Sequence, residues 1–228
     1  MTTAHKSRVL DMTRGDPFRL VLQFSLPLFC SNLLQQVYNL TDTALAHLLG
    51  SAALAEIGAT AALYGLIMNF AFGMNNGLAL TVSRCFGAGE QEGIRRAVGW
   101  MVTLSAAVSL VLTTVSLLGR SALLQALQVP AEGWDGAAAY LTVILLGIPL
   151  TMLYNMEAAL LRAVGNSVTP LLFLLFSSVL NVGLDAAFMG PLGMGVRGAA
   201  VATVLAQGIS AVLGAVYLVR SYPELHFT

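Results

Sequence analysis

Two polar residues interrupt the apolar stretch SSVLNVGLDAAFM at residues 177–189, and both could take part in ion binding. Asn181 and Asp185 are four residues apart and would share one face of a helix. Tyr38 and Asp42 have the same spacing in an earlier apolar stretch. Carboxylate and amide oxygens suit a small hard cation such as Na⁺, and two close carboxylates in a low dielectric would share one proton. In either case the charge of the site changes when the ion or proton binds. A site of this kind is required for coupling to an ion gradient.

The composition indicates that lipid, not water, surrounds these stretches. Of the 228 residues, 57% are hydrophobic and 10% are charged, and the mean hydropathy is +0.80. Soluble domains carry about 25% charge, and a soluble fold of this size could not bury so much apolar surface. The net charge is 0 and no basic patch with interleaved aromatics is present, so a nucleic-acid partner is not expected. Cys30 and Cys85 lack metal-ligand spacing and are expected to be ordinary apolar residues.

Six stretches are long and apolar enough to cross a membrane as helices, since a span needs about 20 residues. They lie at 20–48, 54–82, 97–118, 138–161, 168–189 and 198–219. Connections rich in Gly, Pro or charge separate them. The longest, GRSALLQALQVPAEGWDG, could hold a short interfacial helix, with Trp134 either at headgroup level or as an ordinary loop aromatic. The expected fold is all-α, a single bundle of six transmembrane helices in a multi-pass protein of the cell membrane.

The distribution of basic residues predicts the orientation of this bundle. With six spans, only Arg120 and Arg197 of the 11 Lys and Arg would lie on one side of the membrane. The other basic residues lie on the opposite side: Lys6, Arg8, Arg14, Arg19, Arg84, Arg95, Arg96, Arg162 and Arg220. The positive-inside rule then places both termini in the cytoplasm, with a cytoplasmic segment at residues 1–19.

This topology brings four polar side chains to a similar depth. Asp42 falls in the outer half of the first span, Asn181 and Asp185 in that of the fifth, and Thr203 in that of the sixth. At about 1.5 Å of rise per residue, all lie within roughly 15 Å of the outer boundary. A carboxylate is costly in lipid and is expected to face the protein interior or a watery cavity. We therefore predict that these four residues form an ion-binding cluster, with Tyr38 lining the same cavity.

Plainer roles stay open for the uncharged members of this cluster. Asn181 could simply donate a hydrogen bond to a neighbouring helix, as amides in membranes commonly do. Thr203 could be a packing residue. Tyr38 could be a buried phenol whose hydroxyl is satisfied locally.

Three other polar or helix-bending residues fall within the predicted spans. Glu157 lies five residues before Arg162, and we expect it to snorkel to the cytoplasmic interface or to pair locally. Pro27 and Pro149 each remove a backbone hydrogen bond and allow a kink. Pro27 is a candidate hinge that would link ion binding at Asp42 to bending of the first helix, with a static kink as the alternative.

The chain resembles the multidrug and toxic compound extrusion (MATE) transporters along most of its length. GDPFRLVLQFSLPLFCSNLLQQVYNLTDTALAHLLG resembles the first helix of that family, and GAGEQEGIRRAV resembles the loop between its second and third helices. LLRAVGNSVTPLLF is similar to the loop between helices four and five, and LNVGLDAAFM and GVRGAAVATVLAQ are similar to helices five and six. The similarity runs from about residue 15 to residue 220, in the order of the family.

This resemblance implies a secondary antiporter that exports organic, often cationic, compounds in exchange for H⁺ or Na⁺. Its ion site would use Asp42, Asn181, Asp185 and Thr203, which would also be the metal ligands if Na⁺ is the coupling ion, and Tyr38 would line the cavity. No other cofactor is implied. The family resemblance and the spacing and depth of the polar residues thus point independently to the same residues.

Family members have about twelve helices in two lobes, whereas this sequence corresponds to the N-terminal lobe, residues 20–219, with residues 220–228 resembling the start of the linker between lobes. Alternating access needs a partner lobe. We expect the partner to be a C-terminal lobe, with this chain as part of a longer product, or else a second copy of the chain.

Other function classes fit the sequence less well. Two membrane carboxylates could serve an intramembrane aspartyl protease, but Asp185 lies in VGLD and lacks the expected GxGD context. A non-transporting remnant lobe or assembly module is a second alternative. A lipid-linked saccharide flippase is a third, and the Asp42, Asn181 and Asp185 set argues mildly against it.

Overall fold

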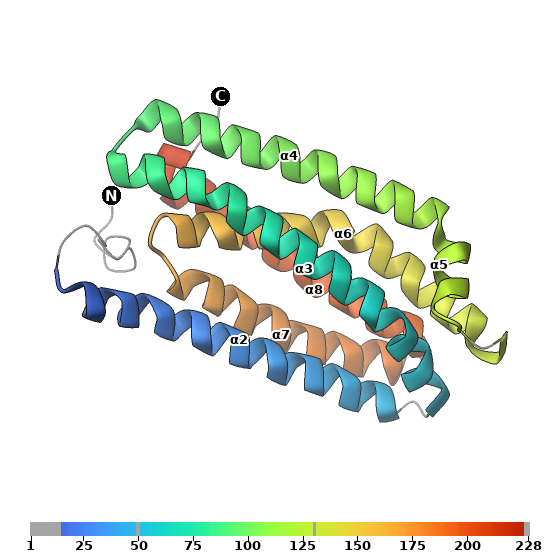
Figure 1. Cartoon of the computed structure of the whole chain (residues 1–228). Helices are drawn as coiled ribbons and strands as arrows, with labels where there is room; N and C mark the ends of the chain where they lie inside the picture. The colour runs from blue at the N-terminus through green and yellow to red at the C-terminus, as the bar shows by residue number, and fades with distance from the viewer. Residues whose placement is uncertain (1–14, 49–50, 130, 226–228) are drawn as a thin grey trace.

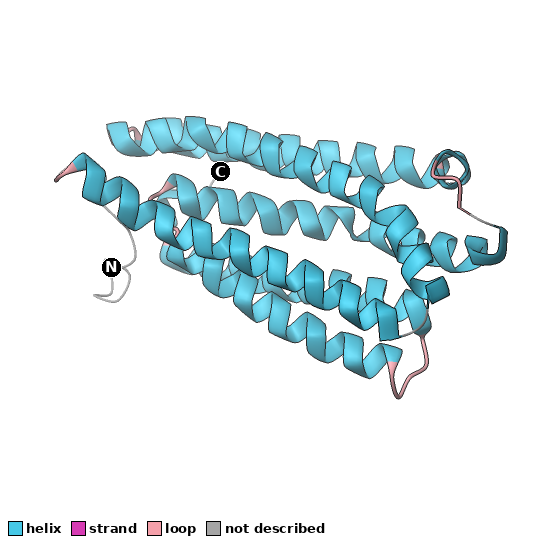
Figure 2. Cartoon of the chain, turned by 60° about the horizontal axis from the view of Figure 1, so that its bottom comes forward, coloured by secondary structure: helices cyan, strands magenta, loops and turns pink. Residues whose placement is uncertain are grey.

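The chain folds as a bundle of long helices, with no strand among the residues described. The computed structural model describes residues 15–48, 51–129 and 131–225. The long helices run alongside one another and are joined mostly by short loops (Figures 1 and 2). Their bounds are α2 (Pro17–Leu48), α3 (Ser51–Ala88), α4 (Gln91–Leu118), α6 (Trp134–Ala163), α7 (Val168–Met189) and α8 (Gly195–Ser221). The short helices are α5 (Arg120–Ala126) and the 3-10 turns η1 (Ala131–Gly133) and η2 (Pro223–Leu225).

Helices α6 and α8 form the centre of the bundle. They pack against each other, α3 and α4 cover α6, and α7 lies against α8 with α2 on its outer side (Figure 1). The two cores along α6 consist mainly of buried aliphatic side chains, represented by Leu145 and Leu161, each 0% exposed. Because α2 packs on α7 and α7 packs on α8, the three helices of the predicted ion site lie side by side.

All the long helices except α7 are longer than the apolar stretches that predict them, and α7 has the predicted bounds, 168–189. The stretch at 54–82 lies inside α3 and that at 97–118 inside α4, because each helix continues into the charged connection between them, where Gly89 has a φ of 71°. The connection after α4 contains α5, and Trp134 is the first residue of α6.

Five of the described helices are long and apolar enough to cross a membrane: residues Pro17–Thr41 of α2, together with α4, α6, α7 and α8. Large apolar side chains cover the outside of the bundle, such as Phe18 at 77% exposed and Leu118 at 84%. A surface this apolar is expected of a protein whose solvent is lipid. A sixth span, in α3, and the cytoplasmic placement of the termini stay predictions.

The proline in the first helix does not interrupt it. Helix α2 continues through Pro27, and the hydroxyl of Ser31 donates to the carbonyl oxygen of Pro27 at 2.9 Å. Pro149 lies within α6 in the same way. A hinge at Pro27 stays a prediction.

Helices α6 and α8 approach closely because glycines face large side chains across the contact. A β-carbon built on Gly147 of α6 would overlap Cγ2 of Val204 on α8, and one built on Gly208 would lie 3.0 Å from Cδ1 of Leu150. The backbones can be this close only while these positions lack side chains.

Replacement of Gly147 with Ala should therefore destabilise the protein by about 1–3 kcal/mol, as overpacked cores do. Thermal or denaturant unfolding in detergent measures the effect. Gly183→Ala on α7 is the matched control, since a β-carbon there meets nothing within 4 Å. It should be neutral or stabilising by up to about 1 kcal/mol through helix propensity. Equal behaviour of the two variants would contradict the close packing.

Candidate ion-binding site

Asn181, Asp185 and Thr203 come together in the interface between α7 and α8. All three are buried, with Asn181 1% exposed, Asp185 0% and Thr203 5%. Asn181 and Asp185 lie one turn apart on the face of α7 that packs against α8. The amide of Asn181 lies 3.4 Å from the hydroxyl of Thr203.

The side-chain amide of Asn181 can be placed in two orientations that exchange its oxygen and nitrogen. The orientation in which both atoms have hydrogen-bond partners joins α7 to α8. In that orientation its nitrogen donates to Oδ2 of Asp185 at 3.1 Å, and its oxygen accepts from the backbone N–H of Thr203 at 3.2 Å. The amide therefore fixes the position of the carboxylate and connects it to α8. This contact also satisfies the plainer role of Asn181, as a hydrogen-bond partner of a neighbouring helix.

Helix α2, which carries the other two predicted site residues, packs beside α7. Tyr38 is half-buried on α2, which packs against α7. Asp42 lies on α2 one turn beyond Tyr38, but its side chain is outside the described part of the structure. Asp42 is six residues before the end of α2, Asp185 four before the end of α7 and Thr203 eight after the start of α8. These helix ends share one end of the bundle (Figure 1), so the positions lie within roughly 12 Å of it.

This arrangement suits a proton or a small hard cation. A carboxylate, an amide and a hydroxyl converge in a buried interface, where oxygen ligands would replace the hydration shell of a cation. The described residues contain no group of three or more His, Cys, Asp or Glu that could hold a metal.

Sequence reasoning missed a second polar network, in the middle of the lobe. Gln207 lies one turn after Thr203 on α8 and contacts two other helices. Its side-chain oxygen accepts from the hydroxyl of Thr151 on α6, and its nitrogen donates to the hydroxyl of Tyr64 on α3 at 3.4 Å. The signal in the sequence is an amide within an apolar span, the same signal that identified Asn181.

The expectation for Glu157 is wrong. Its side chain does not snorkel to the interface but is buried, with 4% exposed. Arg162 contacts α3 instead: its guanidinium donates to the Oδ1 of Asn76 at 3.3 Å and lies over the ring of Phe72 at 5.6 Å. Residues five apart on a helix point about 140° away from each other, so Glu157 and Arg162 face different neighbours.

The comparisons with known proteins identify the fold and the family. The MatE family profile matches residues 27–187. The chain is 29% identical to the probable multidrug resistance protein YpnP of Bacillus subtilis over 214 residues, which cover 93% of this chain and 48% of YpnP. It is 28% identical to the probable multidrug resistance protein NorM of Thermotoga maritima over 195 residues, 84% of this chain and 42% of NorM.

Solved structures give the same result. An outward-facing multidrug resistance MATE family transporter of the MOP superfamily superposes with a TM-score of 0.89 at 27% identity, covering 100% of this chain and 50% of the transporter. A MOP superfamily transporter from Pyrococcus furiosus superposes with a TM-score of 0.88 at 27% identity and the same coverage. The chain spans about half the length of these relatives. It belongs to the MatE family and corresponds to a half-length lobe of the MATE fold, in a multi-pass protein of the plasma membrane.

Proposed function

We propose that this chain is the ion-binding lobe of a secondary antiporter, which exports organic compounds, chiefly cations, in exchange for H⁺ or Na⁺. The coupling ion binds between α2, α7 and α8, with Asp185 and Asp42 as the carboxylates and Asn181 and Thr203 as the neutral ligands. The relatives bear names of multidrug resistance or multidrug export proteins, which supports transport of such compounds here.

The buried carboxylate of Asp185 carries this proposal. It is 0% exposed inside a helix long and apolar enough to span the membrane, and Asn181 holds it by a hydrogen bond. A charged group costs about 2.5–3.5 kcal/mol at the centre of a membrane helix, and a buried carboxylate without a counter-charge is costly nearer the helix end as well. If position 185 served packing alone, an apolar residue would fill it without this cost. Ion binding gives a reason for a carboxylate at this position.

A polar stripe on the outside of α2 supports the presence of a partner lobe. Asn32, Gln36, Asn39 and Thr43 recur every three or four residues along one face of α2 and are all exposed. Gln35 donates to the Oδ1 of Asn39 at 3.3 Å, but amide groups that the protein does not fully satisfy are costly in hydrocarbon. This face is therefore proposed to line a water-filled cavity shared with a second lobe, either a C-terminal lobe or a second copy of the chain, while membrane lipid covers the apolar faces.

The thermal stability of the purified chain against Na⁺ concentration at two pH values tests this function, with K⁺ at equal ionic strength as the control. A ligand at 100 times its Kd stabilises by about 2.7 kcal/mol. Stabilisation specific to Na⁺ would identify a sodium site, and dependence on pH alone a proton site. A stable chain that responds to neither ion would overturn the proposal and favour an assembly module without transport.

A further inference from the structure

We propose that Glu157 is a second proton-binding group, placed at the far end of a polar column that runs along α8 from the Asp185 cluster. The Asp185 cluster lies near one end of the bundle and Glu157 near the other. Phe173 of α7 lies beside Glu157. From Phe173 to Asp185, α7 advances twelve residues, which corresponds to about 18 Å. The two carboxyl groups are therefore separate sites.

The surroundings of Glu157 are built for a neutral acid. The side chain is 4% exposed, and its Oε1 has no hydrogen-bond partner within the described structure. A β-carbon built on Gly214 of α8 would overlap its Oε2. The carboxyl group thus occupies the space that the absent side chain of Gly214 leaves, in close contact with the α8 backbone. A carboxylate anion in this place would be desolvated without a compensating cation, whereas the protonated acid has no net charge to desolvate.

Among the described residues of the helices packed around Glu157, no cation forms an ion pair with it. On α6, Arg162 is turned toward Asn76 and Phe72 of α3, and Tyr154 is uncharged in its phenol form. Asp185, at the distant end, is the charged residue of α7. On α8, Tyr217 packs edge-on against Phe173 at 5.9 Å. The remaining charged residues at this end of α3, α4 and α8 are exposed: Arg84, Glu92, Arg95, Arg96 and Arg220.

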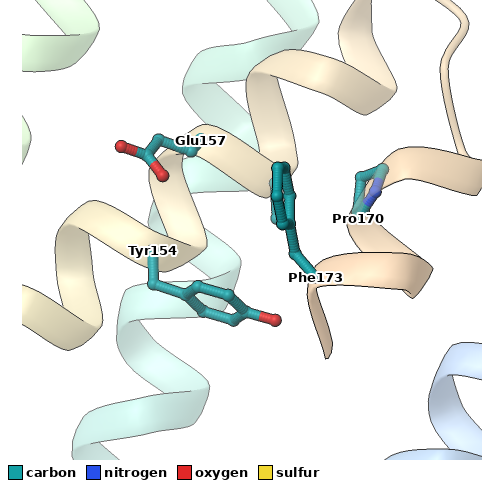
Figure 3. Close-up of a pocket in the computed structure, with 5 residues that line it drawn as sticks. Tyr154, Glu157, Pro170 and Phe173 are labelled. Carbon is teal, nitrogen blue, oxygen red and sulfur yellow. The ribbon is translucent and has the colours of Figure 1, made fainter. Parts of the chain in front are cut away.

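A small pocket lies beside Glu157, between α6 and α7. Tyr154, Glu157 and Ala158 of α6 line it together with Pro170 and Phe173 of α7 (Figure 3). Its walls offer one carboxyl and one phenol, and the rest are carbon. A metal cation takes several oxygen ligands, so this chemistry favours a proton over Na⁺.

Polar side chains lie on the face of α8 between the two sites. Thr203, Gln207 and Ser210 precede Gly214 at intervals of three or four residues, and this face extends about 16 Å. The hydroxyl of Ser210 is 0% exposed and has no hydrogen-bond partner among the described residues. The column is therefore interrupted in this conformation, and water entering between α6 and α8 would complete it.

The proposed step is a reversible loss of the proton to water. When α6 and α8 separate, the O–H bond of the Glu157 acid breaks, the proton passes to an entering water molecule, and the carboxylate remains. Closing the contact with Gly214 requires the proton to return. Protonation of Glu157 and close packing of α6 on α8 thus favour each other, and by linkage each shifts the other by the same free energy.

A pH series on the 228-residue chain in lipid tests this inference. The wild-type melting temperature should fall as the pH rises, because ionised Glu157 opposes the closed packing. Glu157→Gln keeps the size of the side chain and removes its charge. The melting temperature of this variant should therefore fall less than that of the wild type as the pH rises, and at acid pH the variant should be no less stable than the wild type. Glu92→Gln is the matched control, because Glu92 is 89% exposed and paired with Arg96, and it should keep the wild-type profile.

Infrared spectra across the same series give a second measurement that needs no change in stability. The wild type should lose a protonated-carboxyl band on alkalinisation, and Glu157→Gln should lack that band. The effect should be the same in an Asp185→Asn background, since sites this far apart act additively. It is therefore distinguishable from failure of the proposed ion site. An unchanged pH profile and unchanged carboxyl bands in Glu157→Gln, or lower stability of that variant at acid pH, would overturn the inference.

Discussion

Replacement of Asp185 with Asn should abolish the response of this lobe to its coupling ion while leaving the fold intact. The amide has nearly the same shape as the carboxylate, so the contact with Asn181 can be kept after rotation. What disappears is the negative charge that attracts the ion. The stabilisation by ion or proton, about 2.7 kcal/mol at 100 times the Kd, should be lost, and the ion-free protein should be as stable as the wild type or more so.

Melting temperatures measured against Na⁺ and pH show this directly. Asp135→Asn, which removes an exposed carboxylate in the first turn of α6, is the matched control and should respond like the wild type. In the complete transporter, Asp185→Asn should remove ion-driven export and with it the resistance of cells to exported compounds. Asp42→Asn should give the same loss, because the proposed site needs both carboxylates. Full ion response or full resistance in either variant would refute its assigned role.

The fold could be predicted from the sequence largely because apolar length decides it. Once lipid is the solvent, every backbone polar group must be satisfied within the chain, and runs of about 20 apolar residues become helices. All-helical structure is confirmed for the part of the chain that the structure describes. The extent of α3 and α4 was underestimated, because the charged residues between them follow helix propensity and capping by Gly89 rather than hydropathy.

The convergence of Asn181, Asp185 and Thr203 could be predicted because helical spacing fixes a face and topology fixes a depth. Their role in ion binding stays a prediction. Helical spacing and topology could not predict where the side chain of Glu157 points. That depends on which helix packs against its face of α6 and on the space that Gly214 of α8 provides. The contacts of Gln207 likewise depend on the packing order of α3, α6 and α8, which no local pattern encodes.

Asn166→Ala should cause the largest loss of stability among these variants, about 3 kcal/mol. Asn166 is 0% exposed in the connection between α6 and α7. Its amide nitrogen donates to the hydroxyl of Tyr222 at 2.8 Å and to that of Thr169 at 2.9 Å, and its oxygen accepts from the Thr169 backbone at 3.0 Å. One side chain thus joins the start of α7 to the residue that follows α8, and truncation leaves buried polar groups without this partner.

A double-mutant cycle separates the bond across the bundle from the local ones. Tyr222→Phe keeps the ring, which is 1% exposed, and should cost about 1 kcal/mol through the hydroxyl alone. In the Asn166→Ala background the same change should cost much less, because the partner is already gone. Asn155→Ala is the control, since its amide donates to the carbonyl of Thr151 in its own helix, and it should cost less than about 1 kcal/mol. Additive losses for Asn166 and Tyr222 would show that the bond contributes nothing, and the end of α8 would then be held by aliphatic and aromatic packing alone.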